Sequence, residues 1–320
     1  MKALGIDTSN YTCSVAAYDS YTKTVVMKKQ LLPTPEGSVG LRQSQALFEH
    51  VRLLGGRMTE LCEEIDYSFN CIGVSTRPRD VEGSYMPCFL AGSMAAQSLR
   101  AALKIPMRSF SHQQGHIAAA LYSAGKLDWL LGDLHTFFVF HLSGGTTECL
   151  QVKALKGKIL EIKRVGKTLD LNAGQVVDRI GVKLGLSFPA GSALEKLAKN
   201  CSQDVFKNFR ATIPDKGCDC CLSGLENICQ KQISEGKSYV EVARFCIWYI
   251  TLTIDNMLKN LFKLYGKAPV LFAGGVSGNK FLQEYFKERY DGVFAKPEYS
   301  SDNAAGVAIL ACLEEGNALL

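Results

Sequence analysis

Buried strands that end in short turns rich in Ser, Thr or Gly constrain the fold of this 320-residue chain most. The first polar turn, residues 7–12, follows an apolar strand and leads into another, and residues 143–147 have the same context. A third turn lies within 270–279, where a buried strand runs into a helix. Backbone N–H groups in such turns can hold phosphate oxygens, although ordinary tight turns use the same residues. Together the turns predict a duplicated α/β nucleotide-binding fold.

Apolar spacing predicts the other elements that matter for the site. A helix is expected over residues 41–65, and a helix-like run follows the segment 111–116. The longest apolar run, residues 245–254, is too short to span a bilayer and is followed by Asp255, so we expect a buried helix and no membrane association. The N-terminus has no apolar signal segment, which favours a cytoplasmic protein.

A histidine pair is the clearest candidate for a metal site. His112 and His116 are four residues apart and would share one helix face, so both can reach one ion, although surface or packing histidines show this spacing too. Imidazole suits Fe, Zn, Cu or Ni, and a further oxygen ligand is needed. Asp302 could provide it, or could cap the helix that follows. Gln113 replaces the Glu of the zinc-protease H-E-x-x-H motif, which argues against a peptidase.

Cysteine content and charge are less informative. The twelve cysteines are scattered, mostly within apolar segments, and are expected to be reduced thiols. Only residues 218–221 cluster, without the second C-x-x-C of a zinc site, so loop or core thiols are favoured there over a second metal. The net charge of +5 permits a nucleic-acid partner but does not argue for one.

Ordered motifs over nearly the whole chain resemble the tRNA threonylcarbamoyltransferase family, once described as O-sialoglycoprotein endopeptidases. The matching segments are Gly5-Ile6-Asp7-Thr8-Ser9, His112 with His116, Ser143-Gly144-Gly145, Thr168-Leu169-Asp170, Ser223-Gly224-Leu225, Gly274-Gly275-Val276 and Asp302-Asn303. This family is a branch of the actin/heat-shock-chaperone/sugar-kinase superfamily. The resemblance implies a duplicated, two-lobed actin-like α/β fold with a nucleotide cleft between the lobes.

The resemblance also implies how the chain divides into lobes and which reaction it catalyses. We expect an N-terminal actin-like lobe over residues 1–110. A C-terminal lobe over residues 111–320 would carry the metal and adenylate sites, and its last helix would pack back toward the first lobe. The implied reaction moves a threonylcarbamoyl group from threonylcarbamoyl-AMP to the adenosine next to the tRNA anticodon. Its implied partners are tRNA and protein subunits of the transferase complex.

Site residues carried over from the family fall into three groups. One divalent metal, Fe or Zn, would be held by His112, His116 and Asp302. ATP or threonylcarbamoyl-AMP would be bound by the second turn and by residues further along the chain, namely Ser143, Gly144, Gly145, Thr146, Asp178, Gly191, Glu195 and Asn279. Asp7 and Ser9 are the candidate catalytic residues.

Departures from the family pattern leave two alternatives open. The family's acidic pair after G-I-E-T-S is replaced by Tyr11 and Thr12, and its G-P-G-L loop is Arg77-Pro78-Arg79-Asp80 here. Arginines bind carboxylates and phosphates, so one alternative is carbamoyl-type transfer to a small anionic acceptor. The other alternative is a non-catalytic partner subunit of the transferase.

Overall fold

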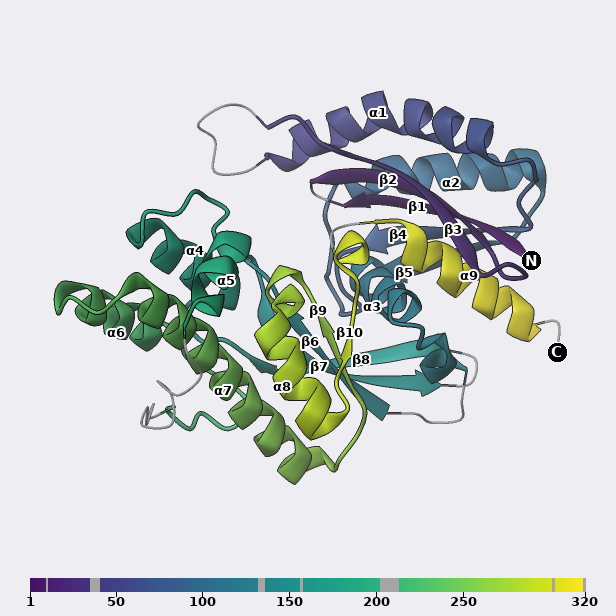
Figure 1. The fold of residues 1–320 in the computed structure, drawn as a ribbon. Coiled ribbons are helices and arrows are strands. Elements are labelled where there is room, and N and C mark those ends of the chain that lie inside the picture. Colours follow the sequence, from purple (N-terminus) through teal and green to yellow (C-terminus); the bar gives the residue numbers. More distant parts are fainter. Residues whose placement is uncertain are drawn as a thin grey trace. The chain divides into compact units, whose positions relative to one another are not determined.

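A computed structural model describes residues 1–9, 11–34, 41–131, 136–155, 158–201, 213–300 and 303–318. Contacts within the chain define two units (Figure 1). Unit 1 comprises Met1–Leu134, Ala154–Glu161 and Glu298–Leu320, and unit 2 comprises His135–Lys153 and Ile162–Pro297. The expected boundary after residue 110 differs from this division, because the histidine helix packs within unit 1.

Among the described residues, unit 1 contains a five-stranded sheet of order β3-β2-β1-β4-β5. The strands β1, β2 and β3 are antiparallel, and β1, β4 and β5 are parallel. In Figure 1, α1 and α2 lie on one face of this sheet and α3 and α9 on the other. The elements are β1 (Lys2–Ser9), β2 (Thr12–Asp19), β3 (Thr24–Leu31), α1 (Gln43–Glu64), β4 (Cys71–Arg77), α2 (Phe89–Leu103), β5 (Met107–Ser111), α3 (His112–Ser123), the 3-10 helix η1 (Leu127–Leu130) and α9 (Ala305–Ala318). The 3-10 helix η4 (Pro297–Tyr299) begins with the last residue of unit 2 and ends in unit 1.

The first predicted turn is shorter in the structure than the sequence indicated. β1 continues to Ser9 and β2 begins at Thr12, with these two residues paired across the hairpin. Asp7, Thr8 and Ser9 are therefore strand residues, and all three are buried. The buried Asp7 carboxylate is tolerated there because it accepts several hydrogen bonds. No local sequence pattern reveals these hydrogen bonds.

Close backbone contact fixes α3 and α9 within unit 1. A Cβ on Gly5 would lie 2.2 Å from the Ala304 carbonyl oxygen, and one on Gly306 would lie 1.8 Å from that of Gly115. Since both approaches exclude any side chain, α9 rests directly on β1 and on α3. This packing places the start of α9 and the histidine helix together on one face of the sheet.

Unit 2 repeats the topology of unit 1. Its described strands form a sheet of order β10-β9-β6-β7-β8, in which β6 is antiparallel to β7 and parallel to β9, as β1 is to β2 and β4. The predicted duplicated α/β fold is thereby confirmed. The elements are β6 (Thr136–Leu142), β7 (Thr147–Leu155), β8 (Lys158–Lys167), α4 (Ala173–Lys183), α5 (Gly191–Lys199), α6 (Ser223–Ser234), α7 (Tyr239–Tyr265), β9 (Val270–Ala273), η3 (Gly275–Gly278), α8 (Lys280–Tyr290) and β10 (Val293–Phe294). The end of β7 and the start of β8 fall in the segment Ala154–Glu161, which is counted with unit 1.

The core of unit 2 combines α7 with an aromatic stack on the sheet. Phe272 stacks on Phe140 and Phe294, with ring centroids 5.4 and 4.8 Å apart. The apolar run that the sequence assigned to a buried helix lies within α7, where Phe245 and Ile254 are buried in this core. None of the described helices has the length and apolar character needed to cross a bilayer.

The cysteines of the chain are free thiols. Burial raises the pKa of Cys13, Cys71 and Cys220 to about 12. Because the thiolate is the metal ligand and nucleophile, these groups are chemically quiet near neutral pH. Within the part of the chain that the structure describes, no group of three or more His, Cys, Asp or Glu residues is arranged to hold a metal, and this includes the Cys218–Cys221 segment.

Candidate functional site

A capping box sets the start of the histidine helix. The Ser111 hydroxyl accepts a hydrogen bond from the backbone N–H of Gln114, and the Gln114 side chain accepts one from the backbone N–H of Ser111. With α3 beginning at residue 112, His112 and His116 fall on the same face of the helix. Their Nε2 atoms lie 2.9 Å apart, so the two imidazoles converge as the sequence predicted.

A buried carboxylate holds one of these imidazoles. Oδ2 of Asp7 lies 2.8 Å from Nδ1 of His112 and also accepts a hydrogen bond from the Ser75 hydroxyl. Oδ1 accepts one from the backbone N–H of Ser9, at 2.9 Å. A proton on Nδ1 that is donated to the carboxylate leaves the lone pair of His112 on Nε2, the atom that faces His116.

The histidine pair fits a metal ion. Two imidazole nitrogens on a tetrahedral ion at about 2.0–2.1 Å would be about 3.3 Å apart. The observed separation of 2.9 Å is slightly shorter, and the carboxylate behind His112 is the usual outer partner of a metal-bound histidine. Asp302, the predicted third ligand, lies outside the described residues. Its neighbour Asn303 accepts a hydrogen bond from the backbone N–H of Ala305 at the start of α9.

Ser9, the other candidate catalytic residue, is only 3 % exposed, and its hydroxyl has no hydrogen-bond partner among the described residues. Its carbonyl accepts a hydrogen bond from Nε2 of His50, at 2.7 Å. Burial lowers the pKa of His50, so this imidazole is neutral at physiological pH. No sequence motif singled out His50. The available indication was its place on the inward face of the helix with Leu54 and Leu61, which are buried too.

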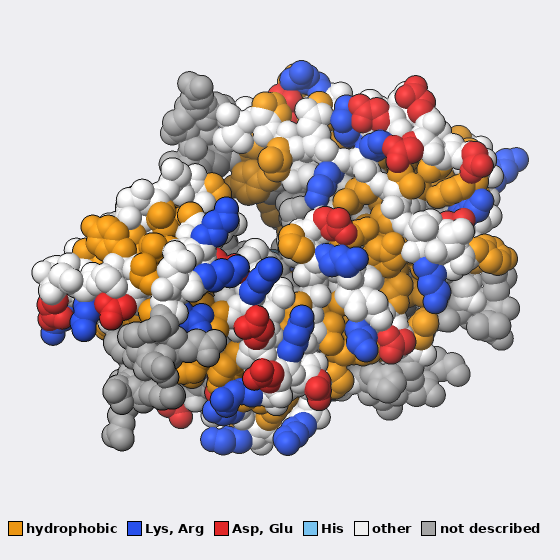
Figure 2. Space-filling model, in the orientation of Figure 1, with side chains coloured by type: hydrophobic (Ala, Val, Ile, Leu, Met, Phe, Trp, Pro, Cys, Tyr) orange, Lys and Arg blue, Asp and Glu red, His pale blue; other side chains and the backbone are white. Residues whose placement is uncertain are grey.

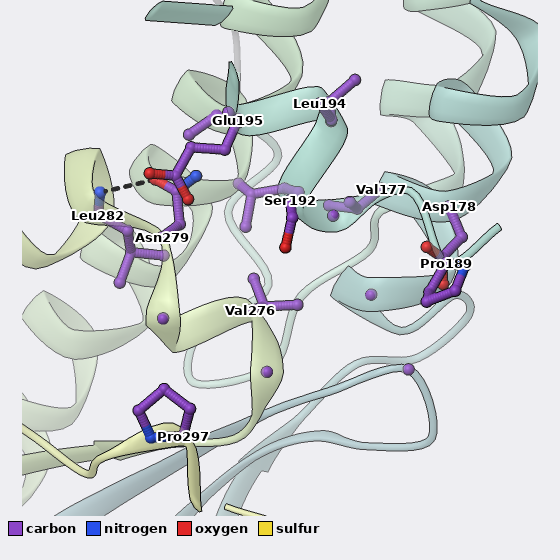
Figure 3. Close-up of a pocket in the computed structure, with 17 residues that line it drawn as sticks. Val177, Asp178, Pro189, Ser192, Leu194, Glu195, Val276, Asn279, Leu282 and Pro297 are labelled. Carbon is purple, nitrogen blue, oxygen red and sulfur yellow. Dashed lines mark hydrogen bonds between the residues drawn. The ribbon is translucent and has the colours of Figure 1, made fainter. Parts of the chain in front are cut away.

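A cavity of about 400 Å³ lies wholly within unit 2 (Figure 3). Residues at the beginnings of α4, α5 and α8 contribute to its walls. The first N–H groups of α4 and α8 already donate to protein oxygens, among them those of Thr147 and Asn279, which leaves the first turn of α5 as the helix start with N–H groups for a ligand. Exposed N–H groups and the helix dipole favour an anion at such ends. In Figure 3, Glu195 and Asn279 lie at one end of the cavity, Asp178 and Pro189 lie at the other, and Ser192 is between them.

Glycines in the cavity wall leave room for a ligand. A Cβ added to Gly144, Gly275 or Gly278 would meet no atom of the described residues within 4 Å, and none of these three has the positive φ that requires glycine. Gly174 differs, because a Cβ there would lie 2.5 Å from the backbone nitrogen of Gly144. Gly174 thus lets α4 pack against the second turn, whereas the other glycines keep the cavity open.

The structure brings together most of the predicted adenylate residues. Among the described residues, the cavity is lined by Gly144, Asp178, Gly191, Glu195 and Asn279, and not by Ser143, Gly145 or Thr146. Ser143 and Thr146 instead shape the turn, since the Ser143 hydroxyl accepts a hydrogen bond from the backbone N–H of Thr146.

The polar residues of the cavity also fix the loops around it. Oδ1 of Asp178 accepts a hydrogen bond from the backbone N–H of Ala190, at 2.8 Å. Oδ1 of Asn279 accepts one from the backbone N–H of Leu282 and so caps α8, at 3.2 Å. Glu195 pairs with Lys199 and accepts a weak hydrogen bond from the backbone N–H of Lys280. The cavity is therefore organised before any ligand enters.

The apolar walls of the cavity were missed at the sequence level. The sequence placed Ile247 and Ile250 in a buried helix and gave Val276 only as part of a motif, without assigning any of them to a cavity wall. The apolar wall residues are Val177, Leu194, Ile247, Ile250, Val276 and Leu282. Such walls suit a flat heteroaromatic ring, while the polar ends supply orientation.

Asp170, a motif residue outside the cavity, has a structural task. It accepts hydrogen bonds from the backbone N–H groups of Leu222 and Ser223 and from the Ser223 hydroxyl, at the start of α6. Partial burial raises the pKa of Asp170, but these hydrogen bonds lower it by more, so the pKa lies below its usual value. Asp170 therefore caps α6 as an anion.

On the visible face of the described residues, charge alone does not mark out a nucleic-acid interface. On the face shown in Figure 2, Lys and Arg side chains are interspersed with Asp and Glu. A mixed surface of this kind agrees with the modest net charge of +5.

Solved structures with similar folds show which fold class the chain has. HypF from T. kodakarensis aligns with a TM-score of 0.60 at 14% identity, covering 99% of this chain and 48% of that one. Component A of (R)-2-hydroxyglutaryl-CoA dehydratase from Acidaminococcus fermentans aligns at 0.52 and 15% identity, covering 99% of each chain. The ROK hexokinase from Thermus thermophilus gives 0.50 at 16% identity, covering 99% of this chain and 100% of that one. The chain thus has the actin-like α/β fold.

Sequence comparison then identifies the family. The model for TsaD, tRNA N6-adenosine threonylcarbamoyltransferase, matches residues 36–309, and the chain belongs to this family. The transferase of that name from Legionella pneumophila (strain Corby) is 27% identical over 326 residues, covering 98% of this chain and 93% of the relative. The transferase from Clostridium novyi (strain NT) is 27% identical over 291 residues, covering 86% of this chain and 81% of the relative. The predictions of the family, the fold and an enzyme of the transferase class are confirmed.

Proposed function

We propose that this protein transfers a threonylcarbamoyl group from threonylcarbamoyl-AMP to the adenosine next to the anticodon of tRNA. The observation that carries the proposal is the preformed cavity of about 400 Å³ in a chain of the TsaD family. Its combination of glycine walls, the N-terminus of α5 and apolar sides suits an adenylate. Because the proposed acceptor is tRNA, the proposed location is the cytoplasm.

The residues of unit 2 would bind the adenylate part of the donor. Val177, Val276 and Ile250 offer apolar surface to the base, and the first turn of α5, which lines the cavity with Gly191 and Ser192, would offer N–H groups to the phosphate. Asp178 and Asn279 stand at opposite ends of the cavity (Figure 3), so they would fix which way the nucleotide lies.

The histidine pair would hold a divalent metal, Fe or Zn, and Asp302 is the proposed third ligand. When bound, such an ion supplies Lewis acidity toward a carbonyl or phosphoryl oxygen. Asp7 keeps the proton of His112 on Nδ1, and Ser75 and the Ser9 backbone hold Asp7 in turn. On this geometry Asp7 is a positioning residue.

The chemistry balances as an acyl transfer. The adenosine amine attacks the carbamoyl carbonyl carbon, a C–N bond forms, the bond from that carbon to the phosphate oxygen breaks, and AMP leaves as the amine loses a proton. An uncharged adenine amine is a weak nucleophile, so orientation must contribute strongly. Tyr11 and Thr12 stand where the family has its acidic pair and supply no carboxylate, so proton removal falls to another group or to water.

The test is mass spectrometry of unmodified tRNA after incubation with the protein, threonylcarbamoyl-AMP and partner subunits from its host. The modified nucleoside should appear with the wild-type chain and decrease strongly with Asn279→Ala. Binding of threonylcarbamoyl-AMP without tRNA modification would refute the proposed acceptor. The alternative of a non-catalytic partner subunit predicts no nucleotide binding, and the cavity and the converging histidines argue against it.

A further inference from the structure

Strand β4 ends in a bulge that brings an arginine next to the histidine helix. In the pairing of β4 with β5, Ser75 lies opposite Phe110 and Arg77 lies opposite Ser111, so Thr76 is an extra residue. Ser111 immediately precedes His112 and caps its helix. Bulges re-aim side chains and often lie beside functional sites.

The loop after this bulge is tied to the histidine helix. The Pro78 carbonyl accepts a hydrogen bond from the backbone N–H of Gln113, at 3.0 Å, and Thr76 donates one to the carbonyl of Phe110 at 3.4 Å. The Ser75 hydroxyl donates to Asp7, the carboxylate that holds His112. The Arg77 backbone and the histidine pair therefore belong to one hydrogen-bonded assembly within unit 1.

The Arg77 side chain is held in place yet accessible. Nη2 lies 2.6 Å from Oδ1 of Asp80, and Nη1 donates to the Thr76 hydroxyl at 3.2 Å. The Arg77 side chain is 31% exposed to solvent. These contacts use two of the five N–H donors of a guanidinium, so much of the planar group can meet a ligand. A pre-oriented guanidinium loses less entropy on binding than a mobile one.

We propose that Arg77 forms a carboxylate-binding subsite beside the histidine pair. The inference rests on the proposed function, because the threonyl part of a threonylcarbamoyl group carries a carboxylate. Arginine binds carboxylates through two parallel, charge-assisted hydrogen bonds. The carboxylate belongs either to the threonyl group of the donor or to a small anionic amine that serves as acceptor.

Ligand binding to the full-length protein tests the donor. The ligands are AMP, threonylcarbamoyl-AMP and an analogue in which threoninol replaces threonine and so removes only the carboxylate. For Arg77→Gln we expect threonylcarbamoyl-AMP to bind on the order of 10- to 100-fold more weakly, the effect of one charge-assisted pair, with AMP and the threoninol analogue unchanged. Arg77→Lys, which keeps the charge but loses the fork, should fall in between. The matched control is Arg52→Gln, since Arg52 also pairs with an acidic residue three positions away and should bind all ligands as wild type.

Kinetics test the acceptor. If Arg77→Gln leaves donor binding unchanged but raises the KM of an amino-acid acceptor and not that of its amide, the subsite serves the acceptor carboxylate. Wild-type donor affinity together with wild-type acceptor kinetics in Arg77→Gln would overturn the proposal, as would an equal loss for AMP and threonylcarbamoyl-AMP. If Arg77→Gln does not fold, the wild-type protein decides: the proposal fails if neither removal of the donor carboxylate nor amidation of the acceptor weakens binding. Failure of the proposed function would appear separately, as wild-type protein that leaves tRNA unmodified.

Discussion

Replacing Asp7 by Asn tests whether this carboxylate positions His112. Asp7 is fully buried and accepts hydrogen bonds from Ser9, Ser75 and His112. An Asn side chain can still accept the hydrogen bond from the Ser9 backbone, but its NH₂ group would face the other two donors. The Ser75 hydroxyl can rotate to accept, whereas His112 must move its proton to Nε2, the atom that faces His116.

The expected losses of stability and of metal affinity follow from the groups that lose a charged hydrogen-bond partner. Hydrogen bonds to charged groups contribute about 1.5–3 kcal/mol each, and with two of them weakened and partly replaced we expect the free energy of unfolding to fall by about 2–4 kcal/mol. Loss of an outer partner of a metal-bound histidine typically reduces metal affinity by about 10- to 100-fold. Denaturant unfolding gives the first quantity, and metal content after stripping and titration gives the second.

Asp19→Asn is the matched control. Asp19 is also nearly buried and accepts a hydrogen bond from the backbone N–H two residues later, but its further contact is with Lys2. We expect wild-type metal affinity and a stability loss below about 1 kcal/mol, typical of a weak ion pair. Equal metal affinity in Asp7→Asn and the wild type would refute the positioning role.

Three further predictions follow. Gly275→Val should leave the melting temperature near that of wild type, because a Cβ there meets no atom of the described residues, yet it should weaken AMP binding more than about 10-fold because the side chain enters the cavity. Gly55→Ala, on an open face of α1, is the control. Undiminished AMP binding by Gly275→Val would contradict the cavity assignment. Asp170→Ala should cost about 1–2 kcal/mol of unfolding free energy through loss of the α6 cap. Since the folded pKa of Asp170 is depressed, its stabilisation is present above the unfolded pKa and is lost as pH falls through the folded value, so the variant should show a shallower acid limb in pH-dependent unfolding. Burial also lowers the folded pKa of His50, so the free energy of unfolding of the wild type should decrease as pH falls below about 6.5. His50→Gln should reduce this dependence of stability on pH. An unchanged dependence would mean that His50 is not a neutral, buried imidazole.

Local sequence determined the elements that bear the site. The spacing of His112 and His116 placed both imidazoles on one helix face, because a helical turn brings residues four apart together. The repeated pattern of strand, polar turn and strand predicted the duplicated sheets, since hairpin geometry depends on neighbouring residues. Ordered motifs along the chain were enough to predict the family.

Tertiary structure alone decided what surrounds those elements. The contacts of Asp7 with Ser75 and His112 join residues 68 and 105 positions apart, and His50 reaches Ser9 across 41. Ile247 and Ile250 read as core residues, yet the fold turns them toward the cavity. The bulge beside Arg77 likewise depends on how β4 pairs with β5. Sequence spacing encodes local geometry, whereas the partner of a buried polar group and the walls of a cavity depend on long-range packing, so only the folded chain reveals them.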